Sequence, residues 1–366
     1  MIEATKYRVA LWGTGNVGRN ALAGVMARPD LELVGVWVSS ESKAGKDAGE
    51  LAGLCVHTKV KATSNRDEIL ALKPDCIVHC AMADNRLVEA IEDLCMILSN
   101  GINVVSSGPV FLQFPYGVVD ESMYQPIVEA CNAGNSSLFV NGIDPGFAND
   151  LLPLVLSGIC EEIEEVRCME ILNYATYNQG TVLMDIMGFG KPIGYVPMLL
   201  HPGVLTMAWG SVLHQLAKGL GIELDSIEES YERVVTDHEI RIDSGTIEAG
   251  TVAALRFELV GLAGNKRPIV LEHVTRLSDD IAPSWPQPVG KGCYRVVITG
   301  EPNYTCDLQL LGRDGDHNTA GLKATAMRLV NSVPSVIKSR SGLISALDLP
   351  LTPGVGLVTS SSKVST

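Results

Sequence analysis

Long apolar runs, basic clusters and signal-like segments are all missing from this sequence of 366 residues. No stretch is apolar over the length that crosses a membrane, and the first 30 residues lack a signal-peptide layout, so we expect a cytoplasmic protein. The 28 basic residues against 42 acidic residues give a net charge of −14. That balance disfavours nucleic acids and anionic membrane surfaces as partners.

Metal-site and hydrolase signatures are missing as well. The nine cysteines are scattered without a CxxC pair, which favours reduced and mostly buried thiols over disulfides. There is no HExxH, no EF-hand loop and no GxSxG motif. We therefore expect neither a metal site nor a serine hydrolase.

A strand, a glycine turn and a helix open the chain. Residues 7–12 form an apolar run, GTGNVG at 13–18 matches GxGxxG, and residues 19–26 are helical in pattern. In a dinucleotide site Gly13 permits the tight turn, Gly15 lets the backbone approach a diphosphate and Gly18 lets the helix pack on the strand. The alternative is a glycine-rich turn without a ligand. The predicted diphosphate-binding residues are Gly13, Thr14, Gly15, Asn16, Val17 and Gly18.

The end of the second predicted strand, at 31–38, decides which dinucleotide fits. Ser39 and Ser40 follow it, where an NAD site usually has an acidic residue, and they leave room for a 2′-phosphate. Lys43 could add a positive charge. NADP is therefore favoured over NAD, although Glu41 could serve as the ribose-binding acid if the strand ends later.

Strands and helices continue to alternate up to residue 140, which predicts a parallel Rossmann sheet in a domain at 1–145. Ala81 and Met82 end one of these strands and are expected to line the cofactor. The other predicted strands are 56–62, 75–80, 103–107 and 137–140, and the helices are 67–72, 86–98 and 123–134.

The second half of the chain alternates apolar and polar residues, as expected for a sheet with one wet face. We predict an α+β substrate domain at 146–315 with a mixed or antiparallel sheet, followed by C-terminal helices at 316–350 that return to the Rossmann domain. The predicted strands are 164–172, 240–242, 246–260, 267–274 and 293–299, and the helices are 204–220 and 318–331.

Five phrases spread over the chain carry a family resemblance: GIDPGFAND at 142–150, MGFGKP at 187–192, APSWP at 282–286, YRVVITGEP at 294–302 and AMRLVNSVP at 326–334. Together they resemble the dihydrodipicolinate-reductase-like oxidoreductases, in the branch of 2,4-diaminopentanoate dehydrogenase and the native amine dehydrogenases. The resemblance implies a nicotinamide cofactor, a homodimer formed through the second domain, and interconversion of an amine with a ketone or aldehyde through an imine. It also places Asn331 at the cofactor.

The sequence departs from this family at one position. Such amine dehydrogenases carry a proton-handling glutamate just after the fifth strand, where this chain has Ser107-Gly108-Pro109-Val110 and no carboxylate before Asp120. Loss of such a group weakens acid–base catalysis by about 10²–10⁴-fold. Either another residue takes the role, or the substrate needs less activation, or the reaction differs.

Three residues are candidates for the catalytic role. Tyr177 could hydrogen-bond a carbonyl or an imine nitrogen, or simply pack as a half-buried tyrosine. His201 would titrate near neutrality, which suits a proton donor, but could equally be a surface or capping residue. Asp144 could replace the lost glutamate, or bond its own backbone in a turn.

The main hypothesis is an NADPH-dependent enzyme that reduces a small, mainly apolar ketone or aldehyde with ammonia or a short amine to an amine. The alternatives are a carbonyl reductase or alcohol dehydrogenase that uses no amine, and a protein that binds NADPH without turnover. In each case the expected ligands are small molecules.

Overall fold

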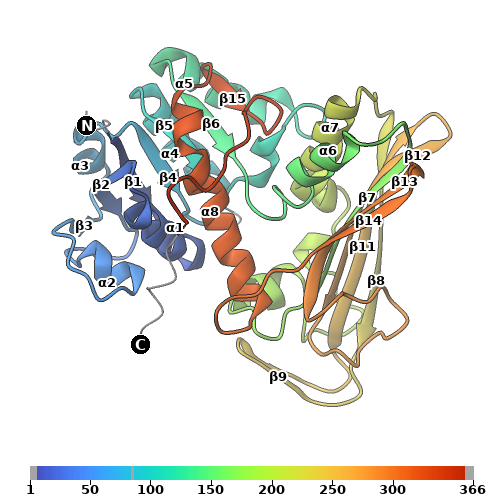
Figure 1. Cartoon of the computed structure of the whole chain (residues 1–366). Helices are drawn as coiled ribbons and strands as arrows, with labels where there is room; N and C mark the ends of the chain where they lie inside the picture. Colours follow the sequence, from blue (N-terminus) through green and yellow to red (C-terminus); the bar gives the residue numbers. More distant parts are fainter. Residues whose placement is uncertain (1–5, 84–85, 359–366) are drawn as a thin grey trace. The chain divides into compact units, whose positions relative to one another are not determined.

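The computed structural model describes residues 6–83 and 86–358, which divide into two compact units (Figure 1). The first unit contains the chain up to Gln113, residues Asp120–Gly142 and the chain from Leu322 onward. The second unit contains Phe114–Val119 and Ile143–Gly321.

The first unit is built on a seven-stranded parallel sheet with the order β15-β6-β5-β4-β1-β2-β3. Its strands are short apolar runs because helices cover both faces, and from β3 to β6 the order is that of a Rossmann fold. The strands are β1 (Tyr7–Trp12), β2 (Leu31–Trp37), β3 (Ala62–Thr63), β4 (Cys76–His79), β5 (Asn103–Ser106), β6 (Ser137–Val140) and β15 (Gly342–Ile344).

Two helices far apart in the sequence share one face of this sheet. Leu22 and Val25 of α1 (Asn16–Ala27) belong to the same buried cluster as Leu329 and Val333 of α8 (His317–Ile337). The C-terminal part of the chain is therefore part of the first unit's core. The remaining helices of this unit are α2 (Ala48–Ala52), α3 (Arg66–Ala71), α4 (Leu87–Ser99) and α5 (Gln125–Gly134), with short 3₁₀ turns η1 (Val110–Gln113) and η2 (Glu121–Met123).

The second unit is built on a six-stranded mixed sheet with the order β14-β13-β7-β12-β11-β8, in which only β7 and β12 pair in parallel. A separate hairpin is formed by β9 (Ile240–Ile242) and β10 (Gly245–Ile247). The strands of the larger sheet are β7 (Glu162–Asn173), β8 (Ser226–Val235), β11 (Val252–Ala263), β12 (Lys266–Arg276), β13 (Gly292–Glu301) and β14 (Tyr304–Leu308).

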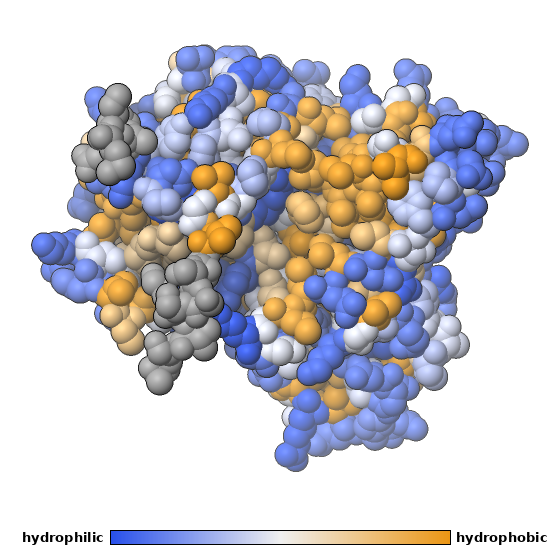
Figure 2. All heavy atoms as spheres, in the orientation of Figure 1, coloured by the Kyte–Doolittle hydropathy of each residue, from blue (hydrophilic) through white to orange (hydrophobic). Residues whose placement is uncertain are grey.

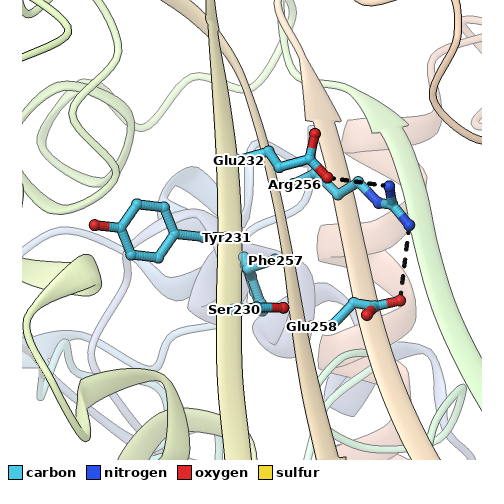
Figure 3. Close-up of a pocket in the computed structure, with 6 residues that line it drawn as sticks. All are labelled: Ser230, Tyr231, Glu232, Arg256, Phe257 and Glu258. Carbon is cyan, nitrogen blue, oxygen red and sulfur yellow. Dashed lines mark hydrogen bonds and ion pairs between the residues drawn. The ribbon is translucent and has the colours of Figure 1, made fainter.

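The two faces of the six-stranded sheet differ in character. Helices α6 (Leu151–Ser157) and α7 (Val204–Leu220) pack on one face, where Trp209 of α7 contacts Phe257 of β11. The opposite face carries ion-paired arginines and glutamates. Figure 3 shows Glu232, Arg256 and Glu258 on this charged face, beside a hollow of about 230 Å³.

The outer surface of α6 is apolar. Val155 on α6 is 55% exposed and Ile159, just beyond the end of the helix, is 69% exposed, and Figure 2 shows apolar side chains, in orange, gathered over this helix. Exposed apolar surface of this kind often marks a contact surface. None of the helices in the described residues is both long and apolar enough to span a bilayer.

Several predicted elements match the structure residue for residue, namely 7–12, 137–140, 240–242 and 204–220. The single strand predicted at 246–260 was wrong: a turn at 248–251 separates β10 from β11, with Gly250 at a φ of +81°. The strand predicted at 56–62 shrinks to β3. Strands β8, β14 and β15 were not predicted. Each is defined by its pairing with a neighbouring strand, namely β11, β13 and β6, rather than by its own pattern.

Candidate active site

The glycine turn after β1 meets the geometric needs of a diphosphate site. Gly13 has a φ of +94°, and a Cβ on it would lie 2.8 Å from the Ala81 nitrogen. A Cβ on Gly18 would lie 2.0 Å from the Gly13 oxygen. Nothing lies within 4 Å of the corresponding position on Gly15. Packing therefore requires the first and third glycines, whereas the second opens onto free space where a ligand can approach.

Helix α1 begins directly at this turn. Its N-cap is Gly15, which provides no side-chain cap, so the positive end of the helix dipole faces the open space. Lys43 lies against the same turn, because its Nζ donates to the carbonyl oxygen of Thr14 at 3.0 Å and to the Thr14 hydroxyl at 3.3 Å. The turn thus combines a helix N-terminus with a fixed cation, as a site for phosphate groups requires.

The loop after β2 is folded back on itself. The backbone nitrogen of Lys43 donates to the Ser40 oxygen at 2.9 Å, and the Ser40 and Ser42 hydroxyls lie 2.7 Å apart. Ser39 and Ser40 are both exposed. The predicted 2′-phosphate residues therefore form one loop, which Lys43 ties to the glycine turn.

The other predicted cofactor residues are placed unequally. Ala81 touches Gly13 through its backbone, and the neighbouring Met82 is 39% exposed. The Asn331 oxygen instead accepts a hydrogen bond of 2.8 Å from Arg28, which follows the far end of α1. A 12-residue helix is about 18 Å long. The structure does not bring Asn331 to the turn, and we leave it out of the proposed binding set.

The second unit holds a row of aligned side chains on the face of the sheet that α7 covers. His273 of β12 is in register with Glu170 of β7, and Phe257 of β11 and Tyr294 of β13 extend the row on either side. The His273 ring stacks on Phe257 at a centroid distance of 4.7 Å, and Trp209 packs edge-on against it at 4.7 Å. Two aromatic contacts therefore fix the plane of the imidazole.

Asp144 joins this row from the turn after β6. Its Oδ1 accepts hydrogen bonds from Trp209 Nε1 at 2.9 Å and from Asn149 Nδ2 at 2.6 Å. The same oxygen lies 3.3 Å from His273 Nε2. This last approach is too oblique for a regular hydrogen bond, and we describe it as an ion pair. The Asp144 side chain is only 3% exposed.

The opposite nitrogen of the imidazole faces a second carboxylate. His273 Nδ1 lies 3.6 Å from Glu170 Oε1, and both side chains are 5% exposed. The Tyr174 hydroxyl donates to the same Glu170 oxygen. We refer to Asp144, His273, Glu170 and Tyr174 as the acid–histidine chain.

Burial shifts the pKa values of the groups in the acid–histidine chain. It raises the pKa of Glu170 to about 7, although the neighbouring His273 pulls that pKa down. Burial by itself would lower the pKa of His273, but Asp144 and Glu170 outweigh it and the net pKa is raised. Burial, and then the Glu170 charge, raise the pKa of Tyr174 well above its usual value. The acid–histidine chain therefore places an imidazole that gains a proton more readily than usual beside a carboxyl group whose protonation changes near neutrality.

The same three side chains could be considered as metal ligands. One ligand-type atom from each of Asp144, Glu170 and His273 lies within 4.8 Å of the others. However, the nearest contacts of the two carboxylates are to different nitrogens of the imidazole. One imidazole binds an ion through a single nitrogen. A histidine bridging two carboxylates is better suited to passing a proton than to chelating a metal.

The three predicted catalytic residues lie in different surroundings. Asp144 is in the acid–histidine chain, and the half-buried Tyr177 packs its ring 4.9 Å from that of Tyr174. His201 is exposed, between η4 (Met198–Leu200) and α7, and its side chain makes no hydrogen bond or ion pair within the described residues. Glu170 and His273 were missed, although titratable residues inside otherwise apolar strands are a recognisable signal.

Comparisons with known proteins agree with this architecture. Residues 147–363 match the family model described as the 2,4-diaminopentanoate dehydrogenase C-terminal domain. The chain is 39% identical over 350 residues to an amine dehydrogenase of Streptomyces virginiae, covering 94% of this chain and 97% of the relative. It is 24% identical to 2,4-diaminopentanoate dehydrogenase of Acetoanaerobium sticklandii, covering 94% of each. A solved amine dehydrogenase from Mycobacterium smegmatis has the same fold, with a TM-score of 0.78, 18% identity, and coverage of 96% of this chain and 98% of that one.

The open space at Gly15 makes a direct test of the turn possible. Gly15 has a φ of −73° that alanine adopts freely, so Gly15→Ala should keep the melting temperature within about 1 °C. Its methyl group should lower the affinity for a nicotinamide dinucleotide by about tenfold or more, measured by calorimetry. Gly194→Ala, which also meets nothing within 4 Å, is the matched control. Unchanged affinity in Gly15→Ala would contradict the assignment of the turn.

Proposed function

The chain belongs to the 2,4-diaminopentanoate dehydrogenase family, and on that premise we propose that it is an amine dehydrogenase that uses a nicotinamide cofactor. The observation that carries the proposal is the match to an amine dehydrogenase at 39% identity over 94% of the chain. The glycine turn before α1 supports the cofactor part. The proposed reaction is the reductive amination of a small, mainly apolar ketone or aldehyde with ammonia or a short amine.

The residues of the chain divide the work of this reaction. The bound nicotinamide supplies or accepts the hydride. The backbone of Gly13–Gly18 is proposed to hold the diphosphate, and Ala81, which touches Gly13, and its neighbour Met82 are proposed to lie beside the cofactor. The second unit contributes the acid–histidine chain, which is proposed to handle protons. The Tyr177 hydroxyl is proposed to orient a carbonyl oxygen or an imine nitrogen. His201 is exposed and has no part in this proposal.

We further propose that NADP is preferred over NAD. The loop after β2 begins with Val38 and two exposed serines, with no carboxylate before Glu41. Lys43 is fixed against Thr14 and supplies a cation near the turn. A 2′-phosphate would find hydroxyl donors and a positive charge there, whereas an NAD ribose usually finds an acidic residue.

The proposed reaction predicts a two-substrate requirement. The purified protein should oxidise NADPH when short aldehydes or cyclic ketones are supplied together with ammonium or methylamine. Omitting the amine should abolish the loss of NADPH absorbance. Equal rates with and without the amine would instead identify a carbonyl reductase, and binding without any turnover would identify a protein that only holds the dinucleotide.

The cofactor preference predicts the effect of a single lysine. Lys43→Ala should weaken NADPH binding by about tenfold, because a charge-assisted contact is lost, while NADH binding changes by less than about twofold. Fluorescence titration with both dinucleotides measures the two constants. Lys46→Ala, which removes a surface lysine paired with Glu50 at 2.9 Å, is the control. An equal loss for both dinucleotides would contradict the NADP assignment.

We also propose that the protein is a homodimer joined through the charged face of the six-stranded sheet. The helices that pack on this sheet within the described residues, α6 and α7, cover the other face. Arg167 and Arg256 alternate with Glu258 and Glu272 across the charged face. Such alternation suits a copy related by a twofold axis, because arginines of one copy can meet glutamates of the other.

The dimer proposal predicts the result of a bulky substitution on that face. Ser230 is exposed on β8 and lines the charged face. Ser230→Arg should convert a dimer into a monomer in sedimentation velocity. Thr246→Arg, on the β9–β10 hairpin, should leave the dimer intact. A monomeric wild-type protein, or a dimer that survives Ser230→Arg, would contradict this interface.

A further inference from the structure

The segment after β5 lacks the carboxylate that the family resemblance leads one to expect. It consists of Ser107-Gly108-Pro109-Val110, and the first acid beyond it is Asp120, 14 positions after the end of β5 at Ser106. Asp120 caps the short turn η2, where its oxygen accepts from the Ser122 nitrogen at 2.9 Å. The proton-handling group of this protein must therefore come from elsewhere in the chain.

We propose that Asp144, His273, Glu170 and Tyr174 form a proton relay that replaces this glutamate, with the Tyr174 hydroxyl as the group that meets the substrate. The inference rests on the proposed function. It assigns roles to Glu170, His273 and Tyr174, three residues that lie outside the segment after β5.

The order of the four groups gives the relay a direction. Asp144 is the closed end, because Trp209 and Asn149 already occupy its Oδ1 and its side chain is 3% exposed. His273 follows and approaches one carboxylate with each nitrogen. Tyr174 is the outer end: the residue as a whole is half-buried, while its hydroxyl lies buried against Glu170, to which it donates.

The electrostatics of the relay centre on His273 and Glu170. Burial alone would lower the pKa of His273, but the flanking Asp144 and Glu170 raise it overall. Glu170 then changes protonation near pH 7. The titratable groups that face Glu170 and His273 are Asp144, Tyr174, Tyr177, Glu272 and Tyr294.

The chemical step uses this relay twice. Ammonia attacks the carbonyl carbon, the C–N bond forms, and the π electrons of the carbonyl move to oxygen. The new ammonium nitrogen gives a proton to the Tyr174 oxygen while the Tyr174 proton moves to Glu170. Glu170 then returns its proton through Tyr174 to the substrate oxygen, which gives the carbinolamine. A second proton, taken by the relay from solvent, reaches the hydroxyl. The hydroxyl leaves as water while the nitrogen lone pair forms the C=N bond of an iminium.

A carboxyl group with a pKa near neutrality is suited to both uses. It must be ionised to accept the first proton and protonated to deliver the second, and the balance is best when the pKa lies close to the working pH. Because Glu170 must first be ionised, ketone amination at a fixed concentration of unprotonated ammonia should fall as the pH drops through about 7. This fall in rate at low pH should be missing in Glu170→Gln.

The decisive experiment compares two substrates in Tyr174→Phe. This variant keeps the ring beside Tyr177 and removes only the hydroxyl. The kcat/KM for a cyclic ketone with ammonia should fall by about 10²-fold, because proton transfer is impaired. Reduction of a preformed cyclic imine, which needs no carbinolamine, should change by less than about threefold. Tyr231→Phe, at a 44% exposed tyrosine on the edge strand β8, is the control.

The outcomes separate the relay from a structural role. Equal losses on ketone and imine would mean that Tyr174 only shapes the fold or the pocket, and no loss on either would exclude it from proton transfer; both results overturn the relay. If the wild-type protein turns over neither substrate, the proposed function fails instead.

A second measurement does not depend on turnover. Infrared difference spectra between about pH 6 and pH 8 should show a protonated carboxyl band that Glu170→Gln removes. A spectrum without that band, or one that Glu170→Gln leaves unchanged, would overturn the relay whatever the activity of the protein.

Discussion

The placement of one buried imidazole between two buried carboxylates is the constraint on which the second unit depends. Asp144 and Glu170 are both withdrawn from water, and two such charges close together would repel each other strongly without a cation between them. His273 lies between them, and its raised pKa favours the cationic form. Phe257 and Trp209 hold the ring in plane, so the position of the imidazole is fixed. Loss of the histidine would remove the neighbour that lowers the pKa of Glu170.

The site in the first unit works by a different principle. The glycine turn uses backbone geometry, an uncapped helix end and the close packing of Gly18 against Gly13 to present amide groups to an anion. A side-chain charge fixed directly against this turn is Lys43, tied to Thr14. This binding mode is insensitive to the overall net charge of −14, because the cation and the helix dipole act locally. In the proposed reaction, one unit therefore supplies an anion site and the other a proton site.

The sequence was sufficient to predict the structure wherever that structure is encoded within a short segment. The strand, turn and helix at 7–27 could be predicted because each glycine answers a local steric demand that alanine cannot meet. The acid–histidine chain could not, because it depends on β7 and β12 pairing in parallel so that Glu170 meets His273. Register between strands separated by about 100 residues has no local signature. The contact of Asn331 with Arg28 likewise depends on the packing of α8 against α1, which no local pattern encodes.

The most direct test is a crystal structure of the protein with NADPH and an unreactive analogue of the amine product. The account predicts the amine nitrogen within hydrogen-bond distance, about 2.6–3.2 Å, of the Tyr174 hydroxyl. A nitrogen more than about 5 Å away, with another titratable side chain in contact with it, would contradict the account.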